Sequence, residues 1–207
     1  PDSEFNRVSD IYPSKPGPLQ YLFPLLTKLP RFMLPGRAKF LLDFGDTSKP
    51  VGAAFNNPPI SSSEGMEANT KQWRNAEIPA ANGHGTARSI AKLYGILANG
   101  GSRDGIHVLS PETIEKGRQT QSDGKDLVLG GMRTRFGLGF MLGTENVSMG
   151  PNPNAFGHGG AGGSLGFSDP DNNISLGFVM NQMHPGITAW KTATDVAESV
   201  YKTLSLN

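Results

Sequence analysis

The stretch Ala155-Phe156-Gly157-His158-Gly159-Gly160-Ala161-Gly162-Gly163-Ser164-Leu165-Gly166-Phe167-Ser168-Asp169-Pro170 organises this chain. Six of the ten residues 157–166 are glycine. The run 174–180, Ile-Ser-Leu-Gly-Phe-Val-Met, alternates and is apolar enough for a half-buried strand. Residues 169–173 are rich in turn formers. We therefore predict two antiparallel strands joined by a short turn, with the glycines marking close approach of another backbone or a ligand.

The composition excludes several classes of function. The chain has 207 residues, enough for one large domain or two small ones. Its net charge of +1, without a block of one sign, gives no electrostatic case for nucleic-acid binding. Disulfide and thiolate chemistry are excluded because the chain has no cysteine. The 27 glycines and 16 prolines predict many turns and long irregular connections.

The first third of the chain is broken up by prolines. Because the sequence begins Pro1-Asp2-Ser3 without an initiator methionine or a signal peptide, we expect it to be cut from a longer polypeptide. The apolar run 19–34 is too short and interrupted to span a membrane, although a short helix fits around 19–26. Residues 41–65 are predicted to be a loop that carries function or borders an active site.

Two helices have clear start signals. Thr86 can cap a helix over 87–98 that ends at Asn99-Gly100-Gly101. Ser110 and Pro111 open a second, short helix. A further helix is plausible over 66–75. The apolar face predicted for the 87–98 helix consists of Ile90, Leu93, Tyr94 and Leu97.

The last third of the chain is predicted to supply a sheet and its covering helix. Residues 136–143 alternate glycine with large apolar side chains, which predicts a strand with one bare face. A helix from about 186 to 204 would close the chain. Its apolar stripe consists of Trp190, Ala193, Ala197, Val200, Tyr201 and Leu204.

Two motifs carry a family resemblance. Residues 73–88, Trp-Arg-Asn-Ala-Glu-Ile-Pro-Ala-Ala-Asn-Gly-His-Gly-Thr-Ala-Arg, and residues 156–169 resemble the C-terminal half of the serine β-lactamase-related family, which comprises class C-like β-lactamases, penicillin-binding-protein-like enzymes and esterases. The resemblance covers roughly residues 50–205. It implies an α/β (α+β) fold, the C-terminal part of a transpeptidase-like sandwich with an antiparallel sheet flanked by helices.

The resemblance also implies an organisation into regions. We expect 1–207 to be part of a single domain. Residues 1–65 would be an irregular connecting region, 66–135 mainly helical, and 136–207 the sheet strands and the C-terminal helix.

The family has three motifs, and the resemblance assigns His158-Gly159-Gly160 to the third. This third motif lies on a strand at the edge of the site. The residue after it, here Ala161, supplies one of two backbone N–H donors to the oxyanion that forms during acyl transfer. Small residues let that strand approach the substrate closely. Without the resemblance, the glycines would be read as relieving crowding at a bulge.

The nucleophile of the family, in a Ser-x-x-Lys motif, is expected upstream of this sequence. Three such spacings occur here, beginning at Ser89, Ser122 and Ser199. Each is an unsuitable candidate, because it lies on an exposed helix face or in a polar loop, whereas the lysine needs partial burial. No tyrosine is followed by x-Asn. The 207-residue chain by itself is therefore expected to be inactive.

His158 bears on the choice of substrate. Lysine at this position, in lactamase-like members, helps to bind a substrate carboxylate, whereas histidine is mostly neutral at pH 7. We hypothesise that the enzyme prefers uncharged esters or amides over penicillins. A lone histidine is more often structural than catalytic, and His158 stands out only by its place in the motif.

A second group of candidates would bind substrate. Asn82 and His84 lie in the loop before the 87–98 helix, which borders the pocket in relatives, and a capping or turn function is at least equally plausible. Ser164 follows the glycines and is otherwise an ordinary strand hydroxyl. No metal site is expected, since the four histidines lack ligand spacing, and neither a phosphate loop nor a cofactor is predicted.

The function implied by the resemblance is a serine hydrolase that acts on small esters or amides through an acyl-enzyme. The alternatives are a non-catalytic relative used for binding or as a scaffold, or a remnant of proteolysis. Without its upstream part the fold would leave apolar surface and strand edges bare. We expect a missing N-terminal segment, or another copy of the chain, to cover them.

Overall fold

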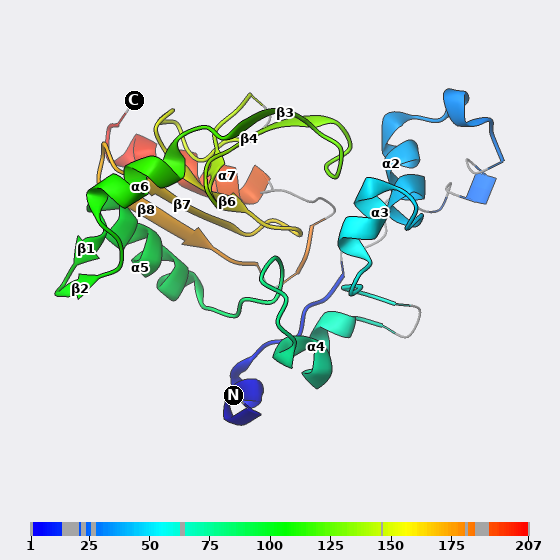
Figure 1. Cartoon of the computed structure of the whole chain (residues 1–207), viewed down its shortest axis with the longest axis horizontal. Coiled ribbons are helices and arrows are strands. Elements are labelled where there is room, and N and C mark those ends of the chain that lie inside the picture. The colour runs from blue at the N-terminus through cyan, green and yellow to red at the C-terminus, as the bar shows by residue number, and fades with distance from the viewer. Residues whose placement is uncertain are drawn as a thin grey trace. The chain divides into compact units, whose positions relative to one another are not determined.

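Figure 1 shows the 207-residue chain as a computed structural model, which describes residues 2–13, 21, 24–25, 28–62, 65–145, 147–180, 182–184 and 191–206. Contacts divide the chain into two units. Unit 1 comprises the residues up to Gly83 together with Asp126–Gly131, and unit 2 comprises His84–Lys125 and the residues from Met132 onwards. Within the described ranges, every helix is too short or too polar to cross a bilayer.

Unit 2 is built on a six-stranded sheet in which every strand neighbours the next along the chain. Four hydrogen-bonded pairings, from β4 to β8, are antiparallel. The predicted pair of strands before and after residues 170–173 is confirmed as β7 and β8, with Phe167 opposite Leu176. The strands are β3 (Ser122–Asp126), β4 (Met132–Phe136), β5 (Met141–Leu142), β6 (Phe156–Gly159), β7 (Leu165–Asp169) and β8 (Ile174–Phe178).

Helix α5 (Ala87–Ala98) packs on β7 and β8, beside which it lies in Figure 1. Its predicted bounds are confirmed. The cap is also confirmed, since the Thr86 hydroxyl accepts from the Ser89 N–H at 3.2 Å. The helix lies close to the strands because two of the strand residues, Gly166 and Gly177, have no side chain. A Cβ on Gly177 would lie 2.7 Å from the Ala91 nitrogen.

For one residue of α5, Leu93, the prediction that it lies on the buried apolar face is wrong. Leu93 is 48% exposed, whereas Ile90 and Tyr94 meet the sheet at Gly166. The orientation of the helix follows the glycine contacts, because they bring Ala87 and Ala91 against Gly177. These contacts turn Leu93 towards solvent.

Helix α7 (Lys191–Thr203) covers the other face of the sheet. Its buried residues Ala193, Ala197 and Tyr201 form one core with Phe167 and Leu176, which alternate along the strands with the glycines under α5. Most of the predicted helix is thereby confirmed, although Leu204 is 54% exposed. Residues 186–190, with Trp190, lie outside the described residues.

The expected strand over 136–143 is wrong. Strand β4 ends at Phe136, a turn closes with the Gly137 N–H donating to the Phe140 carbonyl oxygen at 2.8 Å, and β5 follows. Gly139 has a φ of +82°, a conformation that favours glycine. The glycines therefore bend the chain here.

The expected loop over 41–65 is also partly wrong. Helix α2 (Gly36–Phe44) enters this range and α3 (Pro50–Phe55) lies within it. Aromatic packing accounts for the difference, since the rings of Phe44 and Phe55 stack with their centroids 5.6 Å apart. This contact between two helices offsets the weak local helix signals of the segment. The possible helix around 19–26 lies mostly outside the described residues.

The remaining elements are short. The predicted helix over 66–75 forms as a 3-10 turn, η3 (Glu67–Asn69), followed by α4 (Lys71–Asn75), and the helix after Ser110 is α6 (Pro111–Arg118). Strands β3 and β4 lie within the range that was expected to be mainly helical. That the whole chain is part of one domain stays a prediction. The other elements are η1 (Asp2–Arg7), η2 (Arg31–Met33), β1 (Ser102–Arg103) and β2 (Ile106–His107).

Asp169 joins the β7–β8 turn to α7. Its carboxylate is fully buried and accepts from the Tyr201 hydroxyl, from the Asn152 amide at 2.7 Å, and from the Asn172 amide at 2.9 Å. Burial and the neighbouring carboxylate raise the pKa of Tyr201 well above its ordinary value.

Tyr201→Phe should destabilise the protein at neutral pH by about 1.5–3 kcal/mol, because a buried carboxylate loses a donor. Since the folded pKa of Tyr201 is raised, its contribution is fully present below the unfolded pKa of about 10 and is lost as pH rises above it. Urea unfolding of both proteins from pH 7 to 11 checks this. A difference that stays constant up to pH 11 would contradict the assignment.

Gly177→Ala should destabilise unit 2 by about 1–3 kcal/mol, because the new methyl group meets the backbone of α5. The matched control is Gly124→Ala on β3, where a Cβ meets nothing within 4 Å and stability should stay the same or rise slightly. Equal urea midpoints for the two variants would argue against the glycine contact as the basis of α5 packing.

Candidate active site

The residues predicted to form the third motif lie where β6 runs into a tight turn. His158 and Gly159 end β6, opposite Gly166 and Leu165 of β7. Gly160 and Ala161 begin the turn, which reaches Ser164. The structure thus brings the four predicted catalytic positions together at one end of the β6–β7 hairpin.

Two backbone hydrogen bonds close this turn. The Gly160 N–H donates to the Ser164 carbonyl oxygen at 2.8 Å, and the Gly163 N–H donates to the Gly160 carbonyl oxygen at 3.0 Å. Gly162 and Gly163 have φ values of +84° and +113°. Glycine is required at both because L side chains rarely adopt this backbone region. The glycines of 160–163 therefore build a defined turn.

Ala161 lies exposed within this turn. Within the described part of the chain, its N–H donates to no acceptor. An oxyanion donor needs an N–H that is not engaged by an acceptor of the protein. If this N–H had been engaged in ordinary strand pairing, the assignment of Ala161 would have been excluded.

His158 is exposed at the end of β6. Its Nδ1 lies 2.6 Å from the Gly159 carbonyl oxygen, and its ring centroid lies 5.9 Å from that of Phe136. Because a carbonyl oxygen can only accept, Nδ1–H is assigned as the donor, which leaves Nε2 of the neutral ring as an acceptor. The contact therefore leaves Nε2 as the ring nitrogen of His158 that is free of this carbonyl oxygen.

Ser164 belongs to the same turn, whereas Asn82 makes its hydrogen bonds within unit 1. The Asn82 amide oxygen accepts from the Ile78 N–H at 3.3 Å, and its amide nitrogen donates to the carbonyl oxygens of Trp73 and Ala76. Both donor hydrogens of Asn82 thus close a turn within unit 1. His84 is exposed at the start of unit 2, and the use of either residue in binding stays a prediction.

The three Ser-x-x-Lys spacings have no catalytic geometry. The Ser89 hydroxyl takes part in the cap of α5, accepting from the Thr86 N–H at 2.9 Å. The Ser199 hydroxyl donates to the Asp195 carbonyl oxygen at 2.7 Å, and Ser122 lies on the exposed strand β3. All three lysines, Lys92, Lys125 and Lys202, are exposed, whereas the chemistry needs a partly buried one.

Sequence reasoning missed the segment that lies against the turn. The His184 N–H donates to the Gly162 carbonyl oxygen at 2.9 Å, and the Met183 side chain packs on Gly162. No local pattern connects residues so far apart along the chain. The hydrogen bond between them forms only when β8 has paired with β7 and brought the chain back towards the turn.

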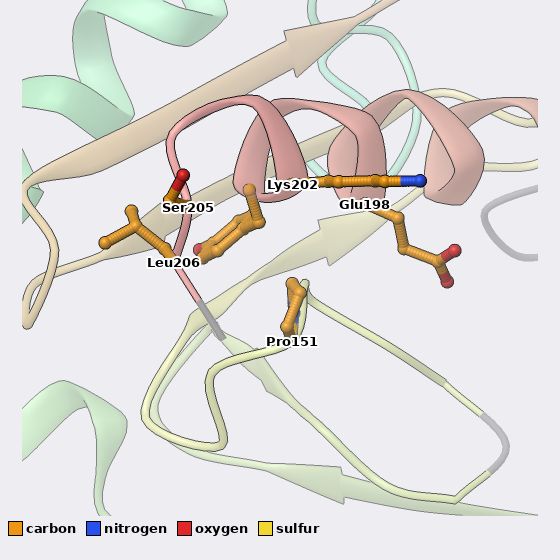
Figure 2. Close-up of a pocket in the computed structure, with 6 residues that line it drawn as sticks. Pro151, Glu198, Lys202, Ser205 and Leu206 are labelled. Atoms are coloured by element: carbon orange, nitrogen blue, oxygen red, sulfur yellow. The ribbon is translucent and has the colours of Figure 1, made fainter.

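A pocket of about 490 Å³ lies elsewhere, between the end of α7 and the loop before β6. Figure 2 shows Glu198 pointing away from the helix beside Pro151. None of the predicted site residues lines this pocket. Among the described residues there is also no cluster of three or more histidine or acidic side chains that could hold a metal ion. The lining residues are Pro151, Glu198, Tyr201, Lys202, Ser205 and Leu206.

Comparison with known proteins defines the class. Residues 35–198 match the model of the family described as Beta-lactamase, so the chain belongs to the Beta-lactamase family. Esterase/beta-lactamase LipL of Mycobacterium tuberculosis is 41% identical over 112 residues, which are 52% of this chain and 24% of LipL. The resemblance drawn from the sequence is thereby confirmed.

Solved structures confirm the β-lactamase/transpeptidase-like fold. A family VIII carboxylesterase is 39% identical with a TM-score of 0.66, over 73% of this chain and 40% of that one. A penicillin-binding protein homologue from Caulobacter crescentus is 31% identical with a TM-score of 0.70, over 98% and 47%. EstA from Arthrobacter nitroguajacolicus Rue61a, 24% identical with a TM-score of 0.71, shares the fold. The chain spans less than half the length of each of these relatives.

Asn82→Asp should destabilise unit 1 by about 1–3 kcal/mol. The substitution replaces an amide nitrogen that donates to two carbonyl oxygens with a carboxylate oxygen, which cannot donate to them. The control is Asn6→Asp, an exposed residue of the same unit, which should change stability by less than about 0.5 kcal/mol. Thermal unfolding and limited proteolysis of unit 1 provide the measurement. If Asn82→Asp were as stable as the wild type, the turn function of Asn82 would be contradicted and substrate binding would remain as the function of this residue.

Proposed function

We propose that the protein is a serine hydrolase that cleaves small uncharged esters or amides through an acyl-enzyme. The observation that carries this proposal is that Ala161, exposed in a glycine turn directly after His158-Gly159-Gly160, donates its N–H to no acceptor among the described residues. Membership of the Beta-lactamase family and the likeness to a family VIII carboxylesterase support it.

The turn would act on the charge that develops during acyl transfer. A serine hydroxyl bonds to the substrate carbonyl carbon, its proton passes to a neighbouring base, and the carbonyl oxygen becomes an oxyanion. The Ala161 N–H donates to that oxyanion beside the nucleophile's own N–H. As the carbonyl reforms, the bond to the leaving alcohol or amine breaks and the leaving group takes the proton. Water then releases the acyl group by the same steps.

The nucleophile and its lysine belong, in this proposal, to a polypeptide segment upstream of Pro1. The exposed lysines of the three Ser-x-x-Lys spacings support this assignment. The chain of 207 residues alone would be inactive. The same upstream segment, or a second copy of the chain, would cover β8, which ends the order of the described strands, and exposed apolar side chains such as Phe32.

The preference for uncharged substrates follows from His158. The His158 imidazole, with Nδ1–H directed at the Gly159 carbonyl oxygen, is not a permanent cation as a lysine ammonium is, and so offers none to a substrate carboxylate. Penicillins carry such a carboxylate, whereas simple esters do not. Asn82, His84 and Ser164 stay proposed contacts to substrate.

The protein produced with its upstream region should hydrolyse short-chain p-nitrophenyl esters faster than nitrocefin. His158→Lys should raise the nitrocefin-to-ester ratio of kcat/KM roughly fivefold, the effect of about 1 kcal/mol from one added charge near a carboxylate. His107→Lys adds the same charge at another exposed histidine, outside the turn, and should leave the ratio unchanged. Faster turnover of nitrocefin by the wild-type protein would refute the preference.

A further inference from the structure

The glycine turn is supported by the segment that follows β8. The His184 N–H donates to the Gly162 carbonyl oxygen at 2.9 Å. A Cβ built on Gly162 would lie 2.8–3.0 Å from three side-chain carbons of Met183. The half-buried Met183 side chain therefore packs directly on the bare Cα of Gly162.

The hydrogen bonds connect three peptide groups in series. The peptide that joins Gly162 to Gly163 accepts from His184 through its carbonyl oxygen and donates through its N–H to the Gly160 carbonyl oxygen. That second carbonyl belongs to the peptide that joins Gly160 to Ala161. Since C=O and N–H of a trans peptide point in opposite directions, the bond from Gly163 directs the Ala161 N–H away from the turn.

We propose that Met183 and His184 are positioning residues for the Ala161 N–H. This inference rests on the proposed function, in which that N–H donates to the oxyanion. Hydrogen bonds in series polarise one another, so the bond from His184 also strengthens Ala161 as a donor. An oxyanion donor is effective because its direction is set before the reaction starts.

The Met183 side chain keeps the peptide groups of this series aligned with one another. It fills the space over Gly162, and the peptide that carries the His184 N–H begins at the Met183 carbonyl carbon. An alanine at 183 would leave a gap and allow that peptide to move relative to the turn. Leucine, which is similar in volume, should restore most of the contact.

The first test is amide hydrogen exchange by NMR on the protein with its upstream region. The Gly163 and His184 amides should be protected in the wild type and exchange about tenfold faster in Met183→Ala. Met183→Leu should retain protection. Met132→Ala, a half-buried methionine on β4, is the matched control and should leave both amides unchanged.

Protection of the β7–β8 amides reports that each variant is folded. Unprotected Gly163 and His184 amides in the wild type would overturn the inference. So would amides whose exchange is the same in Met183→Ala as in the wild type.

The second test is ester hydrolysis by the protein with its upstream region. Met183→Ala should lower kcat about tenfold with KM within about twofold, because the oxyanion exists only in the transition state. Met183→Leu should recover most of kcat. Loss of folded protein would also lower the apparent kcat at unchanged KM, so kcat is calculated per folded molecule, with protection of the β7–β8 amides as the measure of folding.

The two hypotheses fail in different ways. An inactive wild-type protein refutes the proposed function and the catalytic part of this inference, while amide exchange still decides whether Met183 orders the turn. An active wild type whose kcat survives Met183→Ala refutes the positioning inference alone.

Discussion

Unit 2 depends on one constraint: at several glycines of its sheet, other atoms lie closer to the strand backbone than a side chain would allow. On one face of the sheet, Gly177 admits the backbone of α5 and Gly166 admits the rings and methyl groups that α5 presents. Within the sheet, a Cβ on Gly157 would lie 2.6 Å from Cα of Phe167. Protein interiors are packed about as densely as organic crystals, so larger residues at these positions would force the packed elements apart.

The same lack of side chains gives the candidate site its geometry. Beyond β6 the glycines permit a turn with positive φ angles, where strand pairing would otherwise continue. The turn satisfies its own carbonyl oxygen at Gly160, and the exposed Ala161 donates its N–H to no acceptor among the described residues. A backbone donor is then available to a ligand without the desolvation that burial of a polar side chain would require. Packing and chemistry therefore depend on one glycine-rich segment.

Features predicted from the sequence were those whose physical cause is local. Thr86 indicated the start of α5, because its hydroxyl caps the helix by accepting from the N–H three residues later. The alternation of residues 174–180 indicated β8, and the motif spacing indicated the family, which the family model confirms. The predicted site residues from His158 to Ala161 lie together because they are contiguous along the chain. These signals depend only on residues a few positions apart, so they are the same whatever the tertiary arrangement of the rest of the chain.

Other features depend on which surfaces meet, and no local pattern encodes that. Leu93 has the helical spacing of a buried residue, yet the contact of α5 with Gly177 turns it outward. The helices between Gly36 and Phe55 owe their form to aromatic contacts between them. The sequence alone therefore establishes the family and the capped helices, whereas it placed Ala161 on a strand and the structure places it in a turn. The fold adds Met183 and His184 beside Gly162, because their packing and hydrogen bond arise only when distant backbone segments come into contact.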